Sequence, residues 1–161
     1  MKKQKGFSLI ELLIVVAIIL IIAAIAIPNL LRSRMAANES SAVGSIRTMN
    51  TAEVAFATAY PSVGFGSLAA LGGAAASCTG SGATSTMACL IDDTLAATAS
   101  KSGYNFAIGG LSGSPVIVTY SSLATPIVVG QSGQRAFCSD QSGVIRYNQG
   151  GTACTSADAA L

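Results

Sequence analysis

A single carboxylate stands in a long apolar run near the start of the chain. Glu11 is the only charged residue among the 25 residues from Phe7 to Leu31. In lipid or in a packed core, an isolated carboxylate is costly and needs a positive partner. Glu11 is therefore the first candidate for a functional residue, and its partner must be a cation.

The apolar run itself has the dimensions of a membrane helix. Twenty-five helical residues extend roughly 37 Å, which is enough to cross a hydrocarbon core of ~30 Å. Lys2, Lys3 and Lys5 precede the run, so the positive-inside rule predicts a cytoplasmic N-terminus and a translocated remainder. Aliphatic residues surround the predicted helix on all sides, unlike those of an interfacial amphipathic helix.

Three simpler interpretations compete at this point. A plain membrane anchor would not require Glu11. An ordinary secretory signal peptide is supported by the A-x-A-like site Ala24-Ile25-Ala26, although Ile27 and Pro28 would then begin the mature chain. A buried core helix is disfavoured by the length of the run and by the flanking lysines.

The segment Lys5-Gly6-Phe7-Ser8-Leu9-Ile10-Glu11-Leu12 resembles the prepilin leader and mature N-terminus of the type IV pilin and type II secretion pseudopilin superfamily. The pattern comprises a basic leader, a glycine, a phenylalanine, a hydroxyl residue, two aliphatic residues and a glutamate ahead of an apolar helix. The close match covers about residues 1–60, and the later chain matches in layout only.

The resemblance implies processing and assembly roles for three residues. A membrane-embedded aspartyl peptidase of that family would cleave between Gly6 and Phe7 and methylate the new Phe7 amine. Glycine lacks a Cβ and so permits a close approach of the backbone. In the family, the glutamate pairs with the terminal ammonium of a neighbouring subunit, so Glu11 would set the register between subunits, a well-attested use of buried polar groups.

Pro28 interrupts the backbone hydrogen bonds of the predicted helix. It cannot donate to the carbonyl of Ala24, so it kinks or locally opens the helix. The resemblance implies a helix that melts around this proline on assembly, and a simple kink near the membrane surface remains an alternative.

Beyond Pro28 the chain becomes amphipathic, and we predict one helix from about Phe7 to Tyr60, roughly 80 Å long. Pro61 should end it. No partner for Glu53 can be assigned from the sequence. The apolar stripe comprises Leu31, Met35, Ala42, Ile46, Met49, Phe56 and Tyr60.

The predicted organisation has four parts: a leader over 1–6, a transmembrane or fibre-core half of the helix over 7–31, an amphipathic half over 32–60, and a globular head over 61–161. The Gly- and Ala-rich stretch 62–88 predicts a surface loop, and Asp92 or Asp93 could cap a helical turn within 90–100. Four β-prone runs follow, at 104–108, 116–120, 134–139 and 144–147. The fold class is α+β, with an antiparallel sheet of three or four strands packed on the helix.

All four cysteines, Cys78, Cys89, Cys138 and Cys154, fall in the predicted head. An even number in a small exported domain predicts disulfides, with three possible connectivities. We favour the local one, Cys78–Cys89 with Cys138–Cys154. Zinc would require C-x₂₋₄-C spacing, which neither gap provides.

Charge and composition exclude several kinds of function. The formal net charge is +2, but loss of the three leader lysines leaves six basic and seven acidic side chains, a net charge of −1. This balance argues against nucleic-acid binding through a general basic patch, although Arg135 and Arg146 could form a local one. Histidine is absent from the sequence, so no His-based catalytic site is available. Asp140 could bind calcium or simply form a turn.

We therefore expect a structural protein, not an enzyme, without metal or cofactor. It would be the major pilin of a type IV pilus-like filament, drawn from a single-pass inner-membrane pool into an extracellular homo-oligomeric fibre. Its partners would be the prepilin peptidase, an inner-membrane assembly platform and an ATPase. A pseudopilin of a type II secretion system is the main alternative, and a secreted or anchored binding module is an alternative of a different class.

Overall fold

The computed structural model describes residues 7–74, 78–79 and 82–161. They form two compact units, which divide between Arg34 and Met35. One helix, α1 (Leu9–Ala59), supplies residues to both units. The helix predicted for about Phe7 to Tyr60 is thereby confirmed, and Pro28 lies inside it.

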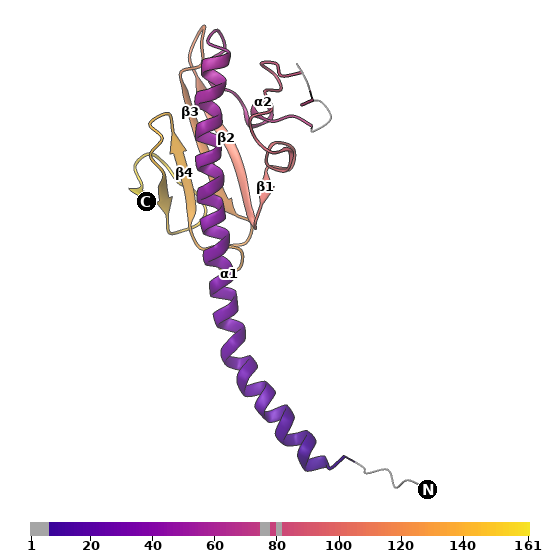
Figure 1. The fold of residues 1–161 in the computed structure, drawn as a ribbon. Helices are drawn as coiled ribbons and strands as arrows, with labels where there is room; N and C mark the ends of the chain where they lie inside the picture. The colour runs from indigo at the N-terminus through magenta and orange to yellow at the C-terminus, as the bar shows by residue number, and fades with distance from the viewer. Residues whose placement is uncertain (1–6, 75–77, 80–81) are drawn as a thin grey trace. The chain divides into compact units, whose positions relative to one another are not determined.

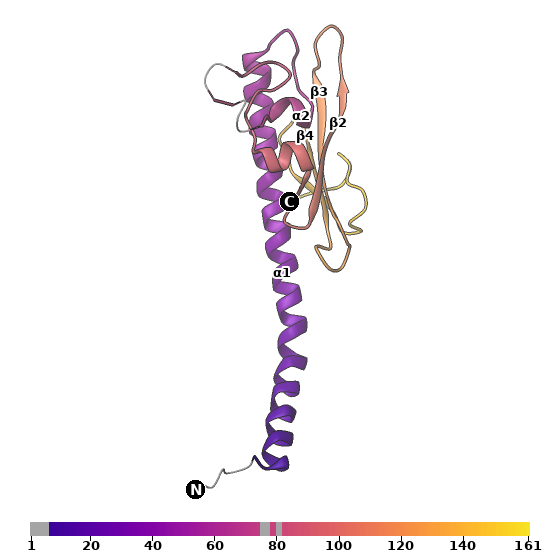
Figure 2. The same cartoon turned by 90° about the vertical axis from the view of Figure 1, so that its right-hand side faces the viewer.

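The second unit contains a six-stranded antiparallel sheet on which the later part of α1 lies (Figures 1 and 2). The strand order is β1-β2-β3-β4-β5-β6, so each strand pairs with the next along the chain. This arrangement confirms the α+β prediction. The strands are β1 (Ser100–Lys101), β2 (Tyr104–Ser112), β3 (Thr119–Pro126), β4 (Ala136–Asp140), β5 (Arg146–Asn148) and β6 (Ala159–Ala160).

Alternation of side chains explains how the central strands bury one face. In β3 the side chains of Tyr120, Ser122, Ala124 and Pro126 are buried, while those between them are more exposed. This period of two is that of a strand with one face on the core. The strand predicted for 116–120 is therefore wrong in its bounds, because β3 begins only at Thr119 and continues to Pro126.

The segment before β3 makes a different backbone pairing from the one predicted. The Ile117 amide donates to the Val63 carbonyl at 2.9 Å, and the Phe65 amide donates to the Ile117 carbonyl at 3.0 Å. Val118 is 60% exposed. The Val116-Ile117-Val118 run thus joins the loop after α1 instead of extending β3. The count of three or four strands was also too low, because β1 and β6 have only two residues each.

The stretch 62–88, predicted as a surface loop, contains a short helix. In α2 (Leu68–Leu71), the Ser67 hydroxyl accepts a hydrogen bond from the Ala70 amide, a typical N-terminal cap. Leu68 and Leu71 are buried, so this part of the loop contributes to the core. The Gly- and Ala-rich composition of 62–88 is typical of a surface loop, so it did not indicate that part of this segment is buried.

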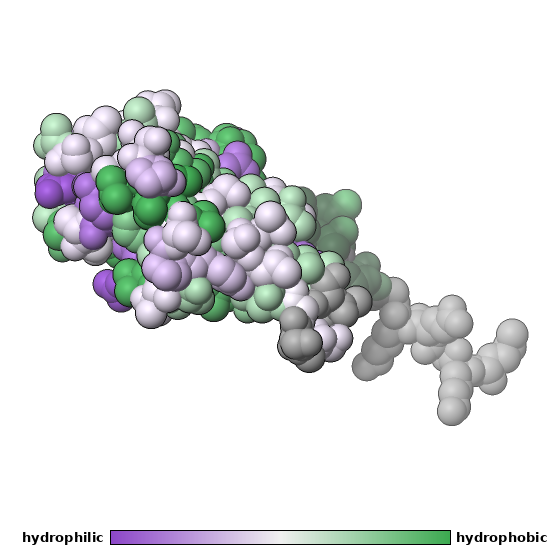
Figure 3. Space-filling model, turned by 90° about the horizontal axis from the view of Figure 1, so that it is seen from above, coloured by the Kyte–Doolittle hydropathy of each residue, from purple (hydrophilic) through white to green (hydrophobic). Residues whose placement is uncertain are grey.

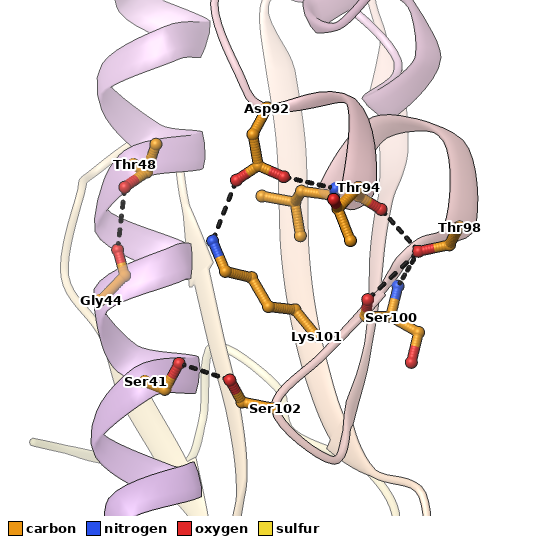
Figure 4. A network of polar contacts seen from close by, with 10 residues as sticks. Ser41, Gly44, Thr48, Asp92, Thr94, Thr98, Ser100, Lys101 and Ser102 are labelled. Atoms are coloured by element: carbon orange, nitrogen blue, oxygen red, sulfur yellow. Dashed lines mark hydrogen bonds and ion pairs between the residues drawn. The ribbon is translucent and has the colours of Figure 1, made fainter.

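The helical turn predicted within 90–100 is present as η1 (Thr94–Thr98). Asp92 accepts a hydrogen bond from the Leu95 amide at 2.7 Å and forms an ion pair with Lys101 of β1 at 2.9 Å. Figure 4 shows this cluster beside α1, where the Ser41 hydroxyl donates to the Ser102 hydroxyl at 3.0 Å. Asp92 thus links η1 to β1, and Ser102 links the β1–β2 turn to α1.

The core lies between α1 and the sheet, closed on one side by α2 and η1. Most of the predicted stripe from Ala42 onward is buried there, whereas Leu31 is exposed. Full burial of a large apolar side chain contributes about 1.5–3 kcal/mol, so this layer stabilises the head. Its largest fully buried apolar members are Ile46, Met49, Phe56, Leu71, Leu95, Tyr104 and Phe137.

Candidate assembly site

The start of α1 places Glu11 one helical turn beyond Ser8. The Ser8 amide donates to Glu11 Oε2 at 2.9 Å, and Ser8 immediately precedes the first helical residue, Leu9. This is the glutamate half of a capping box, which satisfies an amide that would otherwise lack a partner. A carboxylate in the first turn also interacts favourably with the helix dipole. Glu11 therefore has a local structural role as well as the proposed role between subunits.

Gly6 and the leader lysines lie outside the described residues. Phe7, the first described residue, is 77% exposed. Cleavage after Gly6, methylation of Phe7 and pairing of Phe7 with Glu11 stay predictions.

The apolar residues around Glu11 have no packing partner within their own unit. Every large apolar side chain from Phe7 to Leu31 is exposed. An 18-residue window of α1 has a mean hydropathy of 3.3 with none of it buried, which makes α1 long and apolar enough to cross a membrane. The core helix of a soluble protein is mostly buried, which this window of α1 is not, while a signal sequence near the N-terminus would give the same result.

Pro28 lies within the continuous helix α1. The protein as a single chain therefore keeps α1 helical on both sides of the proline. Melting at Pro28 on assembly is a statement about the fibre, and it stays a prediction.

Glu39 connects α1 to the start of β4, a contact that the sequence analysis missed. Glu39 Oε2 accepts from Arg135 Nη2 at 2.8 Å and from Nε at 2.9 Å, while Oε1 accepts from the Gln134 and Arg135 amides. Burial alone would raise the pKa of Glu39, but these four donors outweigh it and hold the pKa below its ordinary value. Glu39 lies four residues after Met35 and three before Ala42, a spacing that could have placed it on the buried face.

The two arginines considered as a basic patch are both engaged. Arg135 pairs with Glu39 and also lies over the rings of Phe137 and Tyr147, 5.4 Å from each centroid. Arg146 Nη1 donates to the Asp158 carbonyl at 3.0 Å. Arg135 is thus paired with a carboxylate, whereas Arg146 has a neutral carbonyl partner and its Nε has no hydrogen-bond partner among the described residues. A local basic patch that includes Arg146 stays an alternative.

Glu53 is a buried acid without a cationic partner among the described residues. Its Oε2 accepts from the Gly66 amide at 2.8 Å, and Oε1 has no partner in the described part of the chain. Burial raises the pKa of Glu53 to about 7, although the hydrogen bond from Gly66 opposes the increase. The partner of Glu53, which could not be assigned from the sequence, is therefore the backbone amide of Gly66 in the loop after α1.

Two disulfides close loops of the head. Cys78 is bonded to Cys89 and Cys138 to Cys154, the local connectivity favoured from the sequence. The second bridge joins the core strand β4 to the C-terminal segment. A cavity of about 400 Å³ lies beside this bridge, lined by residues that include Tyr120, Asp140 and Arg146.

Asp140 forms a turn at the end of β4. Its Oδ1 accepts from the Ser142 amide at 2.8 Å, and Gly143 has a φ of +73°, a conformation that glycine adopts readily. Within the described ranges, no group of three or more potential metal ligands among His, Cys, Asp and Glu comes together. The arrangement around Asp140 is that of a turn residue.

The head presents a weakly polar surface. In Figure 3, which views the molecule from above, pale residues of intermediate hydropathy cover much of the visible face, between smaller apolar and strongly hydrophilic patches. Only 10% of the residues in the chain are charged. Such a surface has few charges with which to hold a nucleic acid or other highly charged partner.

Comparison with known proteins agrees with the geometry at the start of the chain. Residues 1–27 match the model of the prokaryotic N-terminal methylation motif. Together with the exposed apolar helix, this match fits a membrane-anchored precursor and an extracellular pilus. The amino-terminal segment is similar to those of type IV pilins.

Three relatives are described as pilus or fimbrial proteins. The chain is 62% identical over 40 residues, 25% of its length, to the type IV wide pilus major component PilA4 of Thermus thermophilus. It is 46% identical over 54 residues, 34% of its length, to the type IV major pilin protein PilA of Myxococcus xanthus. It is 52% identical over 52 residues, 32% of its length, to a fimbrial protein of Pseudomonas aeruginosa.

These matches cover only part of each relative. The aligned segments span 30%, 24% and 34% of the Thermus, Myxococcus and Pseudomonas proteins, respectively. No solved structure matches the chain. The similarity therefore identifies the pilin-type segment, and the description of the head rests on its own structure.

Proposed function

We propose that this chain is a structural subunit, the major pilin, of a type IV pilus-like filament. A prepilin peptidase would remove residues 1–6 by cleavage between Gly6 and Phe7, and Phe7 would be N-methylated. The processed subunit would remain in the inner membrane, with its N-terminus cytoplasmic, until an assembly platform and its ATPase transfer it into the fibre.

The observation that supports this proposal most directly is the exposed apolar half of α1 with one carboxylate near its start. Its aliphatic side chains are unpartnered within the first unit, so they require lipid before assembly and other helices afterwards. Transfer from lipid to a helix bundle gives little hydrophobic gain, so packing and polar pairing determine the arrangement. Glu11 is suited to that pairing.

The capping contact of Glu11 is compatible with a second partner. A carboxylate has about four acceptor sites, so the hydrogen bond from Ser8 leaves capacity for an ammonium. The Phe7 amine of a neighbouring subunit would remain cationic after methylation. The pair would neutralise the one buried charge of the fibre core and fix the axial position of each subunit.

A pseudopilin of a type II secretion system remains the alternative within the same superfamily. The start of the chain does not distinguish the two. The C-terminal loop closed by Cys138–Cys154 and the Ser- and Thr-rich surface of the head favour a displayed pilus. A secreted or anchored binding module would require a different mature N-terminus.

The test is mass spectrometry of the mature subunit in fibres sheared from cells. We expect a chain that begins at Phe7 and carries one methyl group on its amine. A start at Ile27, or an intact Met1, would overturn the proposal. Abundant long surface fibres made of this subunit would favour the pilus, whereas fibres that appear only with an active secretion system would favour the pseudopilin.

A further inference from the structure

The connection between β3 and β4 exposes three consecutive aliphatic residues. Ile127, Val128 and Val129 are 52%, 45% and 42% exposed. They open the segment Ile127-Val-Val-Gly-Gln-Ser-Gly133, which contains no charged residue. A surface segment of this kind suits an apolar or interfacial environment better than bulk water.

This β3–β4 loop is held against the beginning of α1 within the second unit. The Ile127 amide donates to the Gly103 carbonyl at 3.0 Å, and the Val128 amide donates to the Ser132 hydroxyl at 3.0 Å. Asn38 Nδ2 donates to the Ser132 carbonyl at 2.8 Å. The loop is therefore fixed at the end of the sheet where α1 enters the unit (Figures 1 and 2).

The distance along α1 from this anchor to the membrane segment is short. Asn38 lies seven residues after Leu31, the last residue of the apolar run, so the chain that joins them spans no more than roughly 25 Å however the two units are arranged. The headgroup layer on each side of the hydrocarbon core is roughly 5–8 Å thick. Arg32 and Arg34 occupy the intervening turns, where long cationic side chains reach the headgroups.

We propose that Ile127, Val128 and Val129 form a membrane-contacting tip that enters the interfacial layer of the phospholipid bilayer while the subunit waits for assembly. The tip would give the head a second attachment beside α1, so the head would approach the bilayer in one preferred orientation. This inference rests on the membrane-anchored state in the proposed function and holds equally for a plain anchor.

The absence of tryptophan from the sequence allows a direct test. V128W would place a single fluorophore at the tip. V118W is the matched control, because Val118 is also exposed and lies at the opposite end of β3 from Ile127, roughly 30 Å away along the strand. Both full-length variants would be reconstituted into phosphatidylcholine and phosphatidylglycerol vesicles, with and without lipids brominated near the glycerol end of the acyl chains.

We expect the emission of V128W to shift to shorter wavelength and to be quenched by the brominated lipids, and the emission of V118W to show neither effect. Equal quenching of the two variants would overturn the proposal. A shift in V128W without quenching would also overturn it, because the tip would then be covered by another protein surface. Failure here would leave the Phe7 mass test unaffected, so the two proposals fail separately.

Discussion

At the scale of single residues, three acids on α1 face three different environments. Glu11 lies among exposed apolar side chains and caps the helix. Glu39 is held by four donors, and Glu53 has a single backbone donor. The partners of each glutamate therefore determine its role: Glu11 is a helix cap, Glu39 is part of an ion pair, and Glu53 is a buried acid.

Replacement of Glu11 by glutamine separates its two roles. Glutamine keeps a side-chain oxygen that can accept from Ser8, but it lacks the charge needed to pair with an ammonium. We expect E11Q to accumulate in the membrane and to yield few or no sheared fibres. The measurement is the ratio of fibre to membrane subunit by immunoblot, and wild-type fibre yield in E11Q would show that the charge is not required.

Glu53 predicts an unusual dependence of stability on pH. Because its pKa is about 7 in the folded protein, against 4.5 for an ordinary glutamate, the folded state binds more protons than the unfolded state between these two pH values. The free energy of unfolding should therefore decrease as pH rises through this window, by roughly 1–3 kcal/mol. E53Q should remove this loss and be more stable than the parent at pH ~8.

Glu39 provides the opposite control for that measurement. Its pKa is lowered in the folded protein, so its contribution is present above the ordinary carboxyl pKa and is lost as the pH falls below it. Chemical denaturation of the full chain in detergent, from acidic to mildly alkaline pH, should show both the loss of stability at low pH from Glu39 and the loss towards neutral pH from Glu53. If E53Q retains the parent's decrease towards neutral pH, the explanation is wrong.

At the scale of elements, the Glu39–Arg135 contact joins α1 to β4 across 96 residues of sequence. R135M would leave Glu39 with its two backbone donors and no cation. We expect the free energy of unfolding to fall by about 1–3 kcal/mol. The matched control is R47M, on the exposed side of the same helix, which should change stability little, and equal effects of both variants would refute the assigned role.

The C-terminal disulfide should contribute more than any single surface contact. Its cysteines are 16 positions apart, and closing a loop of that size stabilises a domain by about 3 kcal/mol in the chain-entropy model. We expect C138S/C154S to lower the free energy of unfolding by this order, measured by chemical denaturation. C78S/C89S, whose loop spans 11 positions, should cost slightly less; no loss in either would show that the bridges are dispensable.

The elements differ in how far the sequence could predict them. The length of α1 followed from a continuous helical pattern between Gly6 and Pro61, and Tyr104 and Phe106 correctly marked the start of β2. The alternation of Val116 and Val118 misplaced β3, because a period of two does not reveal whether a segment pairs within the sheet. The Glu39–Arg135 contact depends on tertiary proximity, which no local pattern encodes.

At the scale of the whole molecule, the chain divides into an apolar helical unit and a packed α+β unit. The backbone of a helix in micelles is satisfied internally, whereas the head depends on its core. Heating in detergent should therefore melt the sheet and leave residual helicity from the first unit, Leu9 to Arg34, measured by far-ultraviolet circular dichroism. A single transition that removes all helical signal would contradict this independence.

The strand order of the head has a consequence for how it forms. Because every strand pairs with its immediate neighbour in sequence, sheet formation requires closure of only short loops, which favours rapid folding. The contacts between α1 and β4 require closure of nearly one hundred residues. We therefore expect the strands to pair first after translocation and α1 to pack on the sheet last. Until α1 packs on it, the apolar face of the newly formed sheet is exposed, and the sheet must stay soluble in that state.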